Sequence, residues 1–464
     1  MTTTAAPVAL GSTTRLRAQR DAVVRLLAGA VLWLALLLVT YWWVADGGIQ
    51  DLGGWADGLT SAGRVSGLWS AVLLLAQVVL MARVPVIEGA FGQDRLARTH
   101  RLVGLVSSDL MVIHVVLVTW GYAAGRLVAV PGTFWDLTVD YPGMLLAVAG
   151  TACLVLVVVT SVKAARRRLR YESWHLMHLY AYLGVGLALP HQLWTGAQFL
   201  SRPAATVFWW TAWAAAAGSV LVWRIGVPVI RNLRHGLRVD AVVPEAPGVL
   251  SVWVSGRRLD LLRAEAGQFL MWRFLGRRGW TRANPYSLSA APDGRRLRIT
   301  VEVVGDGSAA LAALRPGTRV LVEGPFGRLS ERARTRRKVA LVGAGVGVVP
   351  LRALAEGLAY GPGEAVLLHR YRDEPLFRGE MEALAGTRGL RIVGLPGSRR
   401  SESSWLPVGS PPIDDARTLL GLVPDLPDRD VFVCGPPGWT DSVTRAATAA
   451  GVPTDHLHVE TFGW

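Results

Sequence analysis

Six long stretches almost without charged residues fill the first half of the chain and constrain its fold more than any other feature. Crossing the hydrocarbon core of a bilayer takes about 20 mainly apolar residues. Five of the stretches contain no Asp, Glu, Lys or Arg, and the third contains only Asp109. They are residues 26–45, 65–82, 102–125, 141–162, 173–201 and 203–223. The sequence therefore predicts an all-α bundle of six transmembrane helices embedded in a lipid bilayer.

Positive charges predict the orientation of this bundle. Lys and Arg in short loops are retained on the cytoplasmic side of a membrane. They cluster in the N-terminal tail and in the loops after the second and fourth stretches. No small-residue cleavage pattern follows the first stretch, which favours an uncleaved span over a signal peptide. We therefore expect a multi-pass protein with both termini in the cytoplasm. The Arg- and Ala-biased composition is typical of some bacteria, for which the membrane would be the plasma membrane.

Composition argues against two other classes of protein. The formal net charge of +15 comes mainly from arginines, many of them between the apolar stretches. That placement predicts a membrane topology and no nucleic-acid partner. Cys153 and Cys434 are the two cysteines, and their separation suits neither a disulfide framework nor a metal site. The redox chemistry is therefore not expected to use thiols.

Four histidines form two matched pairs in or beside the predicted spans. Histidine is costly in a bilayer and usually faces a bundle interior or a cofactor. His100 and His114 follow an H-x13-H pattern, which places them on one helix face and about 21 Å apart along the axis. His178 and His191 follow an H-x12-H pattern, and Pro190 can supply the kink that brings both to one side. Any one of them alone would be interpreted as an interhelical hydrogen-bonding residue.

Two helices that carry imidazoles at matching depths can hold two stacked bis-histidine haems of the b type. The expected ligand pairs are His100 with His178 for the inner haem and His114 with His191 for the outer haem. Gly104, one turn after the first histidine, would let a porphyrin approach the backbone. His175 is expected to be structural or to contact a propionate. Asp109 is expected to form an interhelical hydrogen bond or to relay protons.

The two histidine spacings on the third and fifth of six spans resemble those of the ferric reductase and NADPH oxidase superfamily. This resemblance implies a di-haem transmembrane domain joined to a ferredoxin-reductase-like module. The short β-like alternations and ordinary charge density after about residue 235 fit such a module. The expected segments are a cytoplasmic tail at 1–21, the transmembrane domain at 22–230, an antiparallel β-barrel that binds FAD at 235–330 and an α/β NAD(P)H-binding domain at 336–464.

Two loops of the predicted barrel carry the expected flavin contacts. The first resembles the family's flavin motif, which implies binding of the isoalloxazine and the adjoining chain, although family oxidases often have His at its first position. It reads Asn284-Pro285-Tyr286-Ser287-Leu288-Ser289. The second precedes a predicted helix whose free N–H groups suit a pyrophosphate. Its candidate residues are Gly305, Gly307 and Ser308. Each loop alone would otherwise be interpreted as a plain β-turn.

A glycine-rich turn follows a predicted strand at 338–342 and precedes a helix. This arrangement lets a dinucleotide pyrophosphate approach the backbone. Its candidate residues are Gly343, Gly345, Gly347 and Pro350. A second strand at 430–433 runs into Cys434-Gly435-Pro436, which resembles the family's nicotinamide-side turn. The resemblance implies that Cys434 lies beside the path of the hydride.

The choice of nicotinamide donor and the flavin-stacking residue also follow from the resemblance. Ser398, Arg399 and Arg400 stand where the family usually binds the 2′-phosphate of NADPH, and a guanidinium suits a phosphate. A solvated arginine pair is the alternative interpretation, with NADH as the alternative donor. Phe462 aligns best with the terminal aromatic residue that stacks on the flavin, and Trp464 is the alternative.

Together these features predict an enzyme, an NAD(P)H-dependent transmembrane oxidoreductase. Electrons would pass from cytoplasmic NADPH through FAD and two haems to a small acceptor outside the cytoplasm. Val118 stands where superoxide-forming members have a second histidine, which favours ferric iron over oxygen as the acceptor. The alternatives are an NADPH oxidase that forms superoxide and, from another class, a haem-free membrane anchor or transporter with an attached flavin reductase module. The sequence predicts no oligomeric state.

Overall fold

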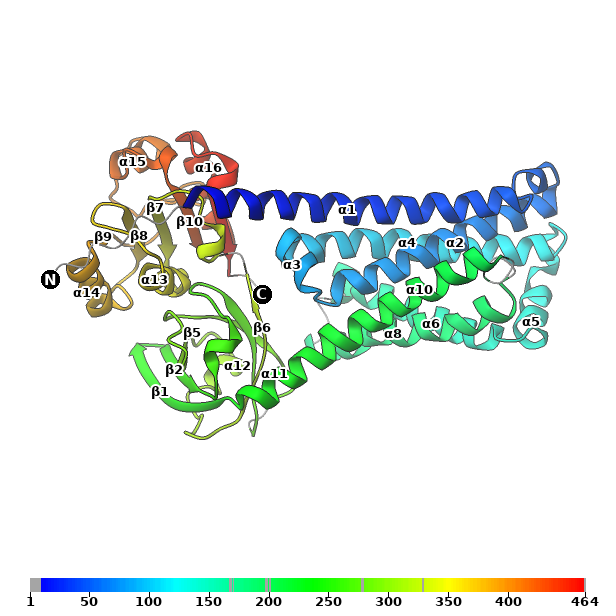
Figure 1. Ribbon diagram of the computed structural model, residues 1–464, viewed down its shortest axis with the longest axis horizontal. Helices are drawn as coiled ribbons and strands as arrows, with labels where there is room; N and C mark the ends of the chain where they lie inside the picture. Colours follow the sequence, from blue (N-terminus) through cyan, green and yellow to red (C-terminus); the bar gives the residue numbers. More distant parts are fainter. Residues whose placement is uncertain are drawn as a thin grey trace. The chain divides into compact units, whose positions relative to one another are not determined.

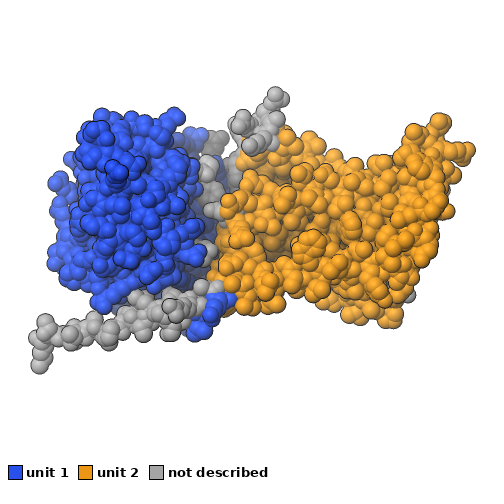
Figure 2. All heavy atoms as spheres, turned by 90° about the horizontal axis from the view of Figure 1, so that it is seen from above, with its two compact units in different colours: residues 1–19, 228–464 blue, residues 20–227 orange. Residues whose placement is uncertain are grey.

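The computed structural model describes residues 10–464 except for 167–168, 170, 197–198, 200–201, 277–278, 328 and 463–464. The chain forms two compact units, which are coloured separately in Figure 2. One unit contains residues 20–227, and the other contains residues 228–464 together with the N-terminal residues up to Gln19. Each unit has its own core.

Residues 20–227 are helical, as Figure 1 shows. The α-helices are α1 (Leu10–Ala45), α2 (Trp55–Met81), α3 (Pro85–Phe91), α4 (Gln93–Tyr122), α5 (Val130–Asp140), α6 (Met144–Ser161), α7 (Lys163–Arg166), α8 (Tyr171–Trp194) and α10 (Pro203–Ser219). Short 3-10 turns lie at Gln50–Gly53 and Leu127–Ala129, and a π-helical segment, Val220–Gly226, joins α10 to α11 (Val227–His235).

Five helical segments of the described chain are long and apolar enough to cross a membrane. They are Gln19–Ala45, Trp55–Met81, Arg95–Tyr122, Met144–Ser161 and Pro203–His235. They contain most of the predicted stretches other than the fifth, so the predicted helical membrane domain is confirmed in these segments. The fifth stretch is also largely helical, as α8, but it is not among the five. Its three histidines, with Gln192 and Pro190, lower its mean hydropathy.

The membrane unit packs in helix pairs around one apolar cluster. Helix α2 packs along α4, and α6 packs along α8. The cluster takes side chains from α1, α2, α4, α6, α8 and α10, and Trp209 of α10 stacks on Phe199 with ring centroids 4.1 Å apart. Many other large apolar side chains of this unit face outward. Outward apolar faces are expected of helices that contact lipid chains, because no water is there to exclude.

The second unit begins with two three-stranded antiparallel sheets, ordered β1-β2-β5 and β4-β3-β6. The strands are β1 (Arg238–Ala246), β2 (Val249–Ser255), β3 (Phe269–Phe274), β4 (Asn284–Ser287), β5 (Arg296–Glu302) and β6 (Val320–Phe326), and the short helix α12 (Asp306–Ala309) follows β5. Isolated bridges connect the two sheets, from Arg238 to Arg319 and from Leu288 to Ile299. Side chains from both sheets share one core that includes Val252 and Trp272.

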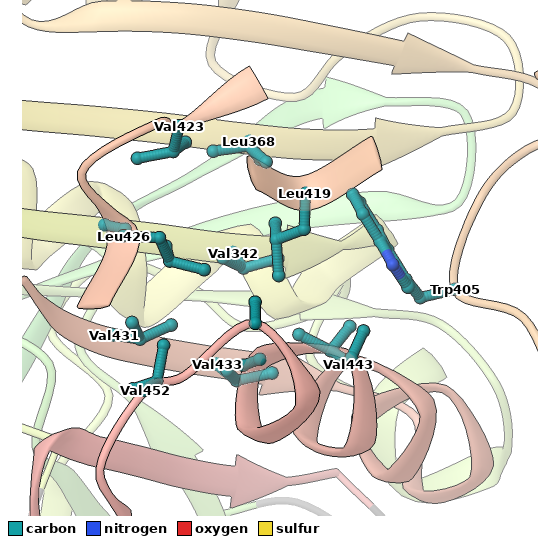
Figure 3. Close-up of a cluster of buried hydrophobic side chains, with 14 of the residues drawn as sticks. Val342, Leu368, Trp405, Leu419, Val423, Leu426, Val431, Val433, Val443 and Val452 are labelled. Carbon is teal, nitrogen blue, oxygen red and sulfur yellow. The ribbon is translucent and has the colours of Figure 1, made fainter. Parts of the chain in front are cut away.

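A five-stranded parallel sheet, ordered β11-β10-β7-β8-β9, forms the C-terminal part. Its strands are β7 (Val339–Ala344), β8 (Ala365–Tyr371), β9 (Arg391–Pro396), β10 (Asp430–Gly435) and β11 (Leu457–Thr461), and its helices are α13 (Val348–Gly357), α14 (Arg378–Arg388), α15 (Asp415–Leu422) and α16 (Pro437–Ala449). Val342 and Val433 pack with side chains of α15 and α16 (Figure 3), whereas Leu341 and Phe432 pack with α13 and α14. The predicted α/β domain is therefore confirmed. The strand order reverses between β7 and β10, where ligands of such sheets bind.

An ion-pair group fixes the start of β10. Asp425 accepts hydrogen bonds from Arg429 and Lys338, at 2.7 Å each. Arg429 also donates to the backbone carbonyl of Val339, at 3.1 Å. Burial alone would raise the pKa of Asp425, but these hydrogen bonds and the two positive charges outweigh burial and lower the pKa from 3.8 to about 2. The group therefore joins the starts of β7 and β10.

Candidate functional site

The first histidine pair comes together between α4 and α8. The ring centroids of His100 and His178 are 6.0 Å apart. Two imidazoles that share one metal ion, each with a metal–nitrogen bond of about 2 Å, place their centroids about 6.3 Å apart. The spacing of the two rings therefore fits two residues that would hold one haem iron. Nδ1 of His178 lies 3.3 Å from the hydroxyl oxygen of Ser161, a contact of the kind that orients metal-ligating histidines.

The second predicted pair, His114 and His191, lies on the same two helices, α4 and α8. The two rings are close enough to interact electrostatically. Nδ1 of His114 lies 2.7 Å from the backbone carbonyl oxygen of Gly63. If Nδ1 donates this hydrogen bond, Nε2 is left as the metal-ligating nitrogen. A Cβ atom at Gly67 would lie 2.5 Å from Nδ1 of His114, so the ring needs a residue without a side chain at that position.

The other two histidines, His100 and His191, have weaker contacts at their ring nitrogens. The ring of His100 contacts the backbone of Gln77, and that of His191 contacts the backbone of Ala188. In the described part of the chain, however, neither Nδ1 atom forms a hydrogen bond of normal geometry. No cluster of three or more His, Cys, Asp or Glu side chains that could hold a metal ion occurs among the described residues. A haem iron would need only two histidines from the protein, so the predicted haem sites do not depend on such a cluster.

The predicted flavin motif begins on β4. Asn284 and Ser287 are buried, and Pro285 and Tyr286 between them are partly exposed. Nδ2 of Asn284 is buried and has no hydrogen-bond partner among the described residues. The predicted pyrophosphate loop lies beside it, because a Cβ atom on Gly307 would be 3.9 Å from Oδ1 of Asn284. The fold thus brings two separately predicted flavin loops together.

Three other residues of the predicted flavin loops pack against or form hydrogen bonds with the rest of the protein. Leu288 is fully buried in the core shared by the two antiparallel sheets. The hydroxyl of Ser289 accepts hydrogen bonds from Arg298, at 3.0 Å, and Thr300, at 2.8 Å. The hydroxyl of Ser308 accepts hydrogen bonds from the backbone N–H of Val304 and Gly305. These side chains therefore shape the flavin loops from within.

The glycine turn lies at the reversal point of the parallel sheet. Gly343 lies in β7, just before the last residue of the strand. The turn Gly345–Gly347 follows, and Pro350 is buried in α13. A Cβ atom on Gly347 would lie 2.1 Å from the carbonyl oxygen of Cys434 and 2.8 Å from Cα of Gly435. The structure therefore places the two predicted nucleotide turns in direct backbone contact.

Cys434 occupies the end of β10 and is fully buried. Burial and, secondarily, the negative charge of Glu460 raise the pKa of its thiol well above the usual value. The thiol is therefore neutral at physiological pH. Pro436 caps α16, and the backbone N–H of Phe462 donates to the carbonyl of Gly435 at 3.1 Å. Phe462 thus lies beside this turn, whereas Trp464 is outside the described residues.

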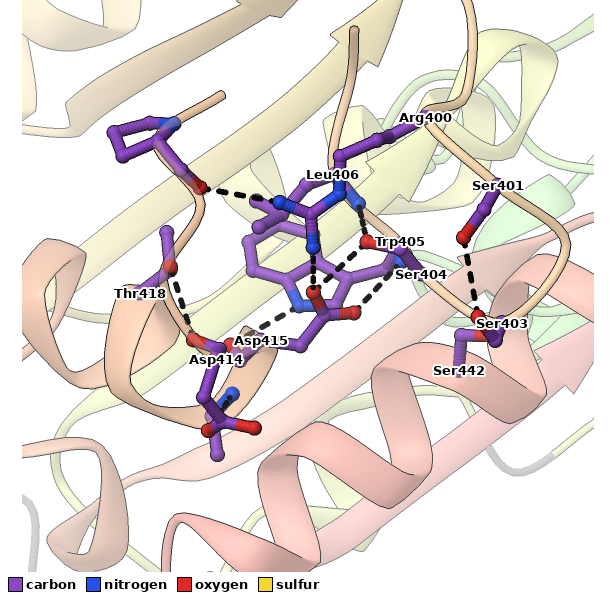
Figure 4. A network of polar contacts seen from close by, with 12 residues as sticks. Arg400, Ser401, Ser403, Ser404, Trp405, Leu406, Asp414, Asp415, Thr418 and Ser442 are labelled. Carbon is purple, nitrogen blue, oxygen red and sulfur yellow. Dashed lines mark hydrogen bonds and ion pairs between the residues drawn. The ribbon is translucent and has the colours of Figure 1, made fainter. Parts of the chain in front are cut away.

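The residues predicted to bind the 2′-phosphate of NADPH lie in the loop after β9. Arg400 pairs with Asp415, Nη2 to Oδ1 at 2.8 Å, and donates to the carbonyl of Pro411 (Figure 4). Arg399 donates to the carbonyl of Gly438 and to the hydroxyl of Ser442, both at 2.8 Å. Ser398 is exposed. Both guanidinium groups thus already stabilise their own loop, with Arg399 attaching it to α16.

Two residues that sequence reasoning missed lie at the end of β8. His369 is 3% exposed, and its Nε2 has no hydrogen-bond partner among the described residues. Burial lowers the pKa of His369 to about 4, and its ring contacts the backbone of Gly345 in the glycine turn. Burial, followed by the charges of Arg372 and Arg399, lowers the pKa of Arg370. The available signal was their place at the carboxyl end of a parallel strand beside the glycine turn.

The fold and these sites define a membrane protein with a flavin- and nicotinamide-type reductase module. Residues 66–189 match the family described as "Ferric reductase like transmembrane component". The chain therefore joins a ferric-reductase-like transmembrane domain to a ferredoxin-reductase-like FAD/NAD-binding module, as the sequence predicted.

Two curated relatives resemble the second part of this architecture, and a solved structure aligns with part of the chain. The ferredoxin reductase component of 3-ketosteroid-9-alpha-monooxygenase from Mycolicibacterium smegmatis is 32% identical over 44% of this chain and 57% of its own length. The ferredoxin–NAD(+) reductase component of the alkene monooxygenase system from Xanthobacter autotrophicus is 33% identical over 40% of this chain and 57% of its own length. The chain thus spans little more than half the length of these relatives. Among solved structures, the Amycolatopsis cytochrome P450 reductase aligns with 49% of this chain and 69% of its own at 22% identity, with a TM-score of 0.41.

Proposed function

We propose that this protein carries electrons from cytoplasmic NAD(P)H through FAD and two b-type haems to an acceptor on the outer side of the membrane. Ferric iron or another small oxidant is the acceptor that we favour. The observation that carries the proposal is the pairing of His100 with His178 at 6.0 Å, matched by a second histidine pair on the same two helices. Two such pairs would give two one-electron carriers in series.

The proposal requires that α8 also crosses the membrane, in addition to the five segments identified by length and hydropathy. Its length of 24 residues is sufficient for a span, and it packs along the apolar helix α6. The polar residues that lower its hydropathy include two of the four proposed haem ligands, His178 and His191. Haem ligation would remove part of their cost in the bilayer, because the imidazoles would then have partners.

The reductase module supplies the residues that would hold the other two cofactors. FAD, when bound, supplies the conversion of two-electron into one-electron transfer. The segment 284–289 and the loop of Gly305, Gly307 and Ser308 would bind it within a barrel formed by the two bridged sheets. The turn of Gly345 and Gly347 would bind the nicotinamide dinucleotide.

Within this module, the chain's own residues set the position and the electrostatics. Gly347 lets the turn after β10 approach the turn after β7, and Phe462 lies beside that turn. The protonated Cys434 thiol adds no negative charge to the site. Arg370 and Arg372 follow the end of β8 within electrostatic range of Arg399 in the loop after β9. This positive charge supports NADPH as the donor, because its 2′-phosphate is anionic.

Anaerobic stopped-flow spectroscopy of the detergent-purified protein loaded with FAD tests the proposal. Haem bands would be followed after mixing with NADPH or NADH, and ferric chelates or oxygen would be added afterwards. We expect both haems to become reduced, faster with NADPH, and then to be oxidised by the ferric chelate. A protein without haem, or haem that stays oxidised while the flavin bleaches, would contradict transmembrane electron transfer.

A further inference from the structure

The backbone carbonyl of Ser289, at the end of the predicted flavin motif, lies at the centre of a group of charged side chains. It accepts hydrogen bonds from Nη2 of Arg298, at 2.8 Å, and from Nη1 of Arg352, at 3.0 Å. Arg298 belongs to β5 of the antiparallel sheets, whereas Arg352 belongs to α13, which follows the glycine turn. One carbonyl of the flavin loop is therefore held by both parts of the reductase module.

Two carboxylates complete this group, which we name the Ser289 clamp: Arg298, Arg352, Glu356 and Glu380. Glu380 of α14 pairs with Arg298 through both oxygens, at 2.7 and 2.9 Å, and forms an ion pair with Arg352 at 2.6 Å. Glu356 accepts from Arg352 at 2.6 Å and from the backbone N–H of Ala291 at 2.6 Å. The clamp therefore holds the flavin loop at two backbone positions.

Burial makes the clamp sensitive to the loss of one member. The side chains of Arg298 and Arg352 are 3% and 8% exposed, whereas those of Glu380 and Glu356 are 36% and 35% exposed. Burial alone would raise the pKa of Glu380, but its hydrogen bond from Arg298 and the charge of Arg352 outweigh burial and lower the pKa. Two arginines and two carboxylates balance in charge. Removing Glu380 would leave buried positive charge that is only partly compensated, which proteins tolerate poorly.

The residues around the clamp are also closely packed. The Arg298 guanidinium lies over two aromatic rings, 5.1 Å from the centroid of Trp253 and 4.9 Å from that of Phe377. A Cβ atom on Gly357, at the end of α13, would lie 2.6 Å from Cβ of Ala266 in the antiparallel part. The two parts of the module therefore have little freedom to shift without disturbing the clamp.

We propose that the Ser289 clamp is a positioning device that fixes the flavin loop relative to the glycine turn and thereby sets the geometry of hydride transfer. This inference rests on the proposed function, because it assumes that the module binds FAD and NAD(P)H. The four side chains act through Ser289 and Ala291, so they are positioning residues. A displacement of about 1 Å in such a site costs about a hundredfold in rate, which gives the clamp a measurable effect.

The test compares Glu380→Gln with Glu382→Gln in the full-length protein. Glu382 lies on the same helix, is largely exposed and pairs with Arg378 one turn away, so it is a matched control outside the clamp. Glu380→Asp keeps the charge but withdraws the carboxylate by one methylene, and it decides the question if the Gln variant does not fold.

The first readout is amide hydrogen exchange of the flavin-free protein across residues 288–291. We expect exchange about tenfold faster in Glu380→Gln and a smaller increase in Glu380→Asp, because the bonds that hold Ser289 and Ala291 loosen. Glu382→Gln should match the wild type. Unchanged exchange in both Glu380 variants would overturn the inference, and this readout does not depend on any cofactor.

The second readout is the rate constant of flavin reduction at saturating NADPH, measured by stopped flow. We expect it to fall at least about tenfold in Glu380→Gln, with an unchanged dissociation constant for NADPH and unchanged FAD content. A fall explained entirely by loss of FAD would show a merely structural role and would overturn the inference. If the wild-type flavin is reduced by neither NADPH nor NADH, the proposed function fails instead, and the exchange data still report on the clamp.

Discussion

Gly347→Ala tests the arrangement of the two nucleotide turns most directly. The added Cβ would lie 2.1 Å from the carbonyl oxygen of Cys434 and 2.6 Å from its carbonyl carbon. Both are backbone atoms at the end of a buried parallel strand, so no flexible side chain can move aside. The turn after β7 or the end of β10 must shift instead.

The required shift sets the expected size of the effect. Real Cβ atoms are essentially never found closer than 3.0 Å to such neighbours, so the two turns must separate by about 1 Å. A misplacement of that size reduces the rate of a positioned reaction by about a hundredfold. Overpacking at this buried site should also lower the free energy of unfolding by about 1–3 kcal/mol.

The assay is anaerobic flavin reduction by NADPH, followed at increasing concentrations of NADPH. Gly386→Ala is a suitable control, because a Cβ atom there meets nothing within 4 Å and the residue lies inside α14. It should react at the wild-type rate and be more stable by about 0.5–1 kcal/mol. Chemical reduction by dithionite, which bypasses the nicotinamide site, should be normal in both variants. A wild-type rate in Gly347→Ala would refute the proposed contact between the two turns.

Three further predictions concern other parts of the chain. His178→Leu should remove about half of the bound haem, measured as pyridine haemochrome per protein, whereas His175→Leu on the same helix should retain both haems. Because the pKa of Asp425 is lowered to about 2, its ion pairs should stabilise the fold above about pH 4 and lose that effect as the pH falls towards 2. We expect acidification from about pH 4 to pH 2 to lower the free energy of unfolding of Asp425→Asn by about 1 kcal/mol less than that of the wild type, after allowance for the partial exposure of Asp425. Thermal unfolding at several pH values measures this difference. Leu419→Ala removes a fully buried side chain from the core below α15 and should lower the free energy of unfolding by about 3 kcal/mol in denaturant titrations.

The sequence predicted the elements whose signal is local. Long apolar runs, a strand followed by a glycine turn, and histidines spaced along a helix each depend on neighbours within a few turns. Helix α5 (Val130–Asp140) escaped prediction because it is too short to span a membrane, although Pro131 at its start is a helix-start signal.

Contacts between residues far apart in the sequence could not be predicted from such local signals. Arg298 and Glu380 are 82 residues apart in the sequence, and nothing beside either residue indicates its partner. Ser289 shows the same difficulty within a motif. Its place in the flavin motif was visible in the sequence, but only the fold shows that its hydroxyl is occupied by Arg298 and Thr300. Arg399 and Arg400 likewise matched an expected position, and the structure shows them holding their own loop.

Helix α8 shows why the site and the fold place opposite demands on one segment. A span that ligates two haems must carry polar imidazoles at two depths, and each lowers the apolar character that a span needs. In the structure α8 packs along α6, one of the strongly apolar helices, and its His178 lies against His100 of α4. A segment that looks too polar for a membrane is therefore the one expected to carry the electron-transfer chemistry. Hydropathy alone would exclude α8, whereas hydropathy combined with the spacing of its histidines selects it.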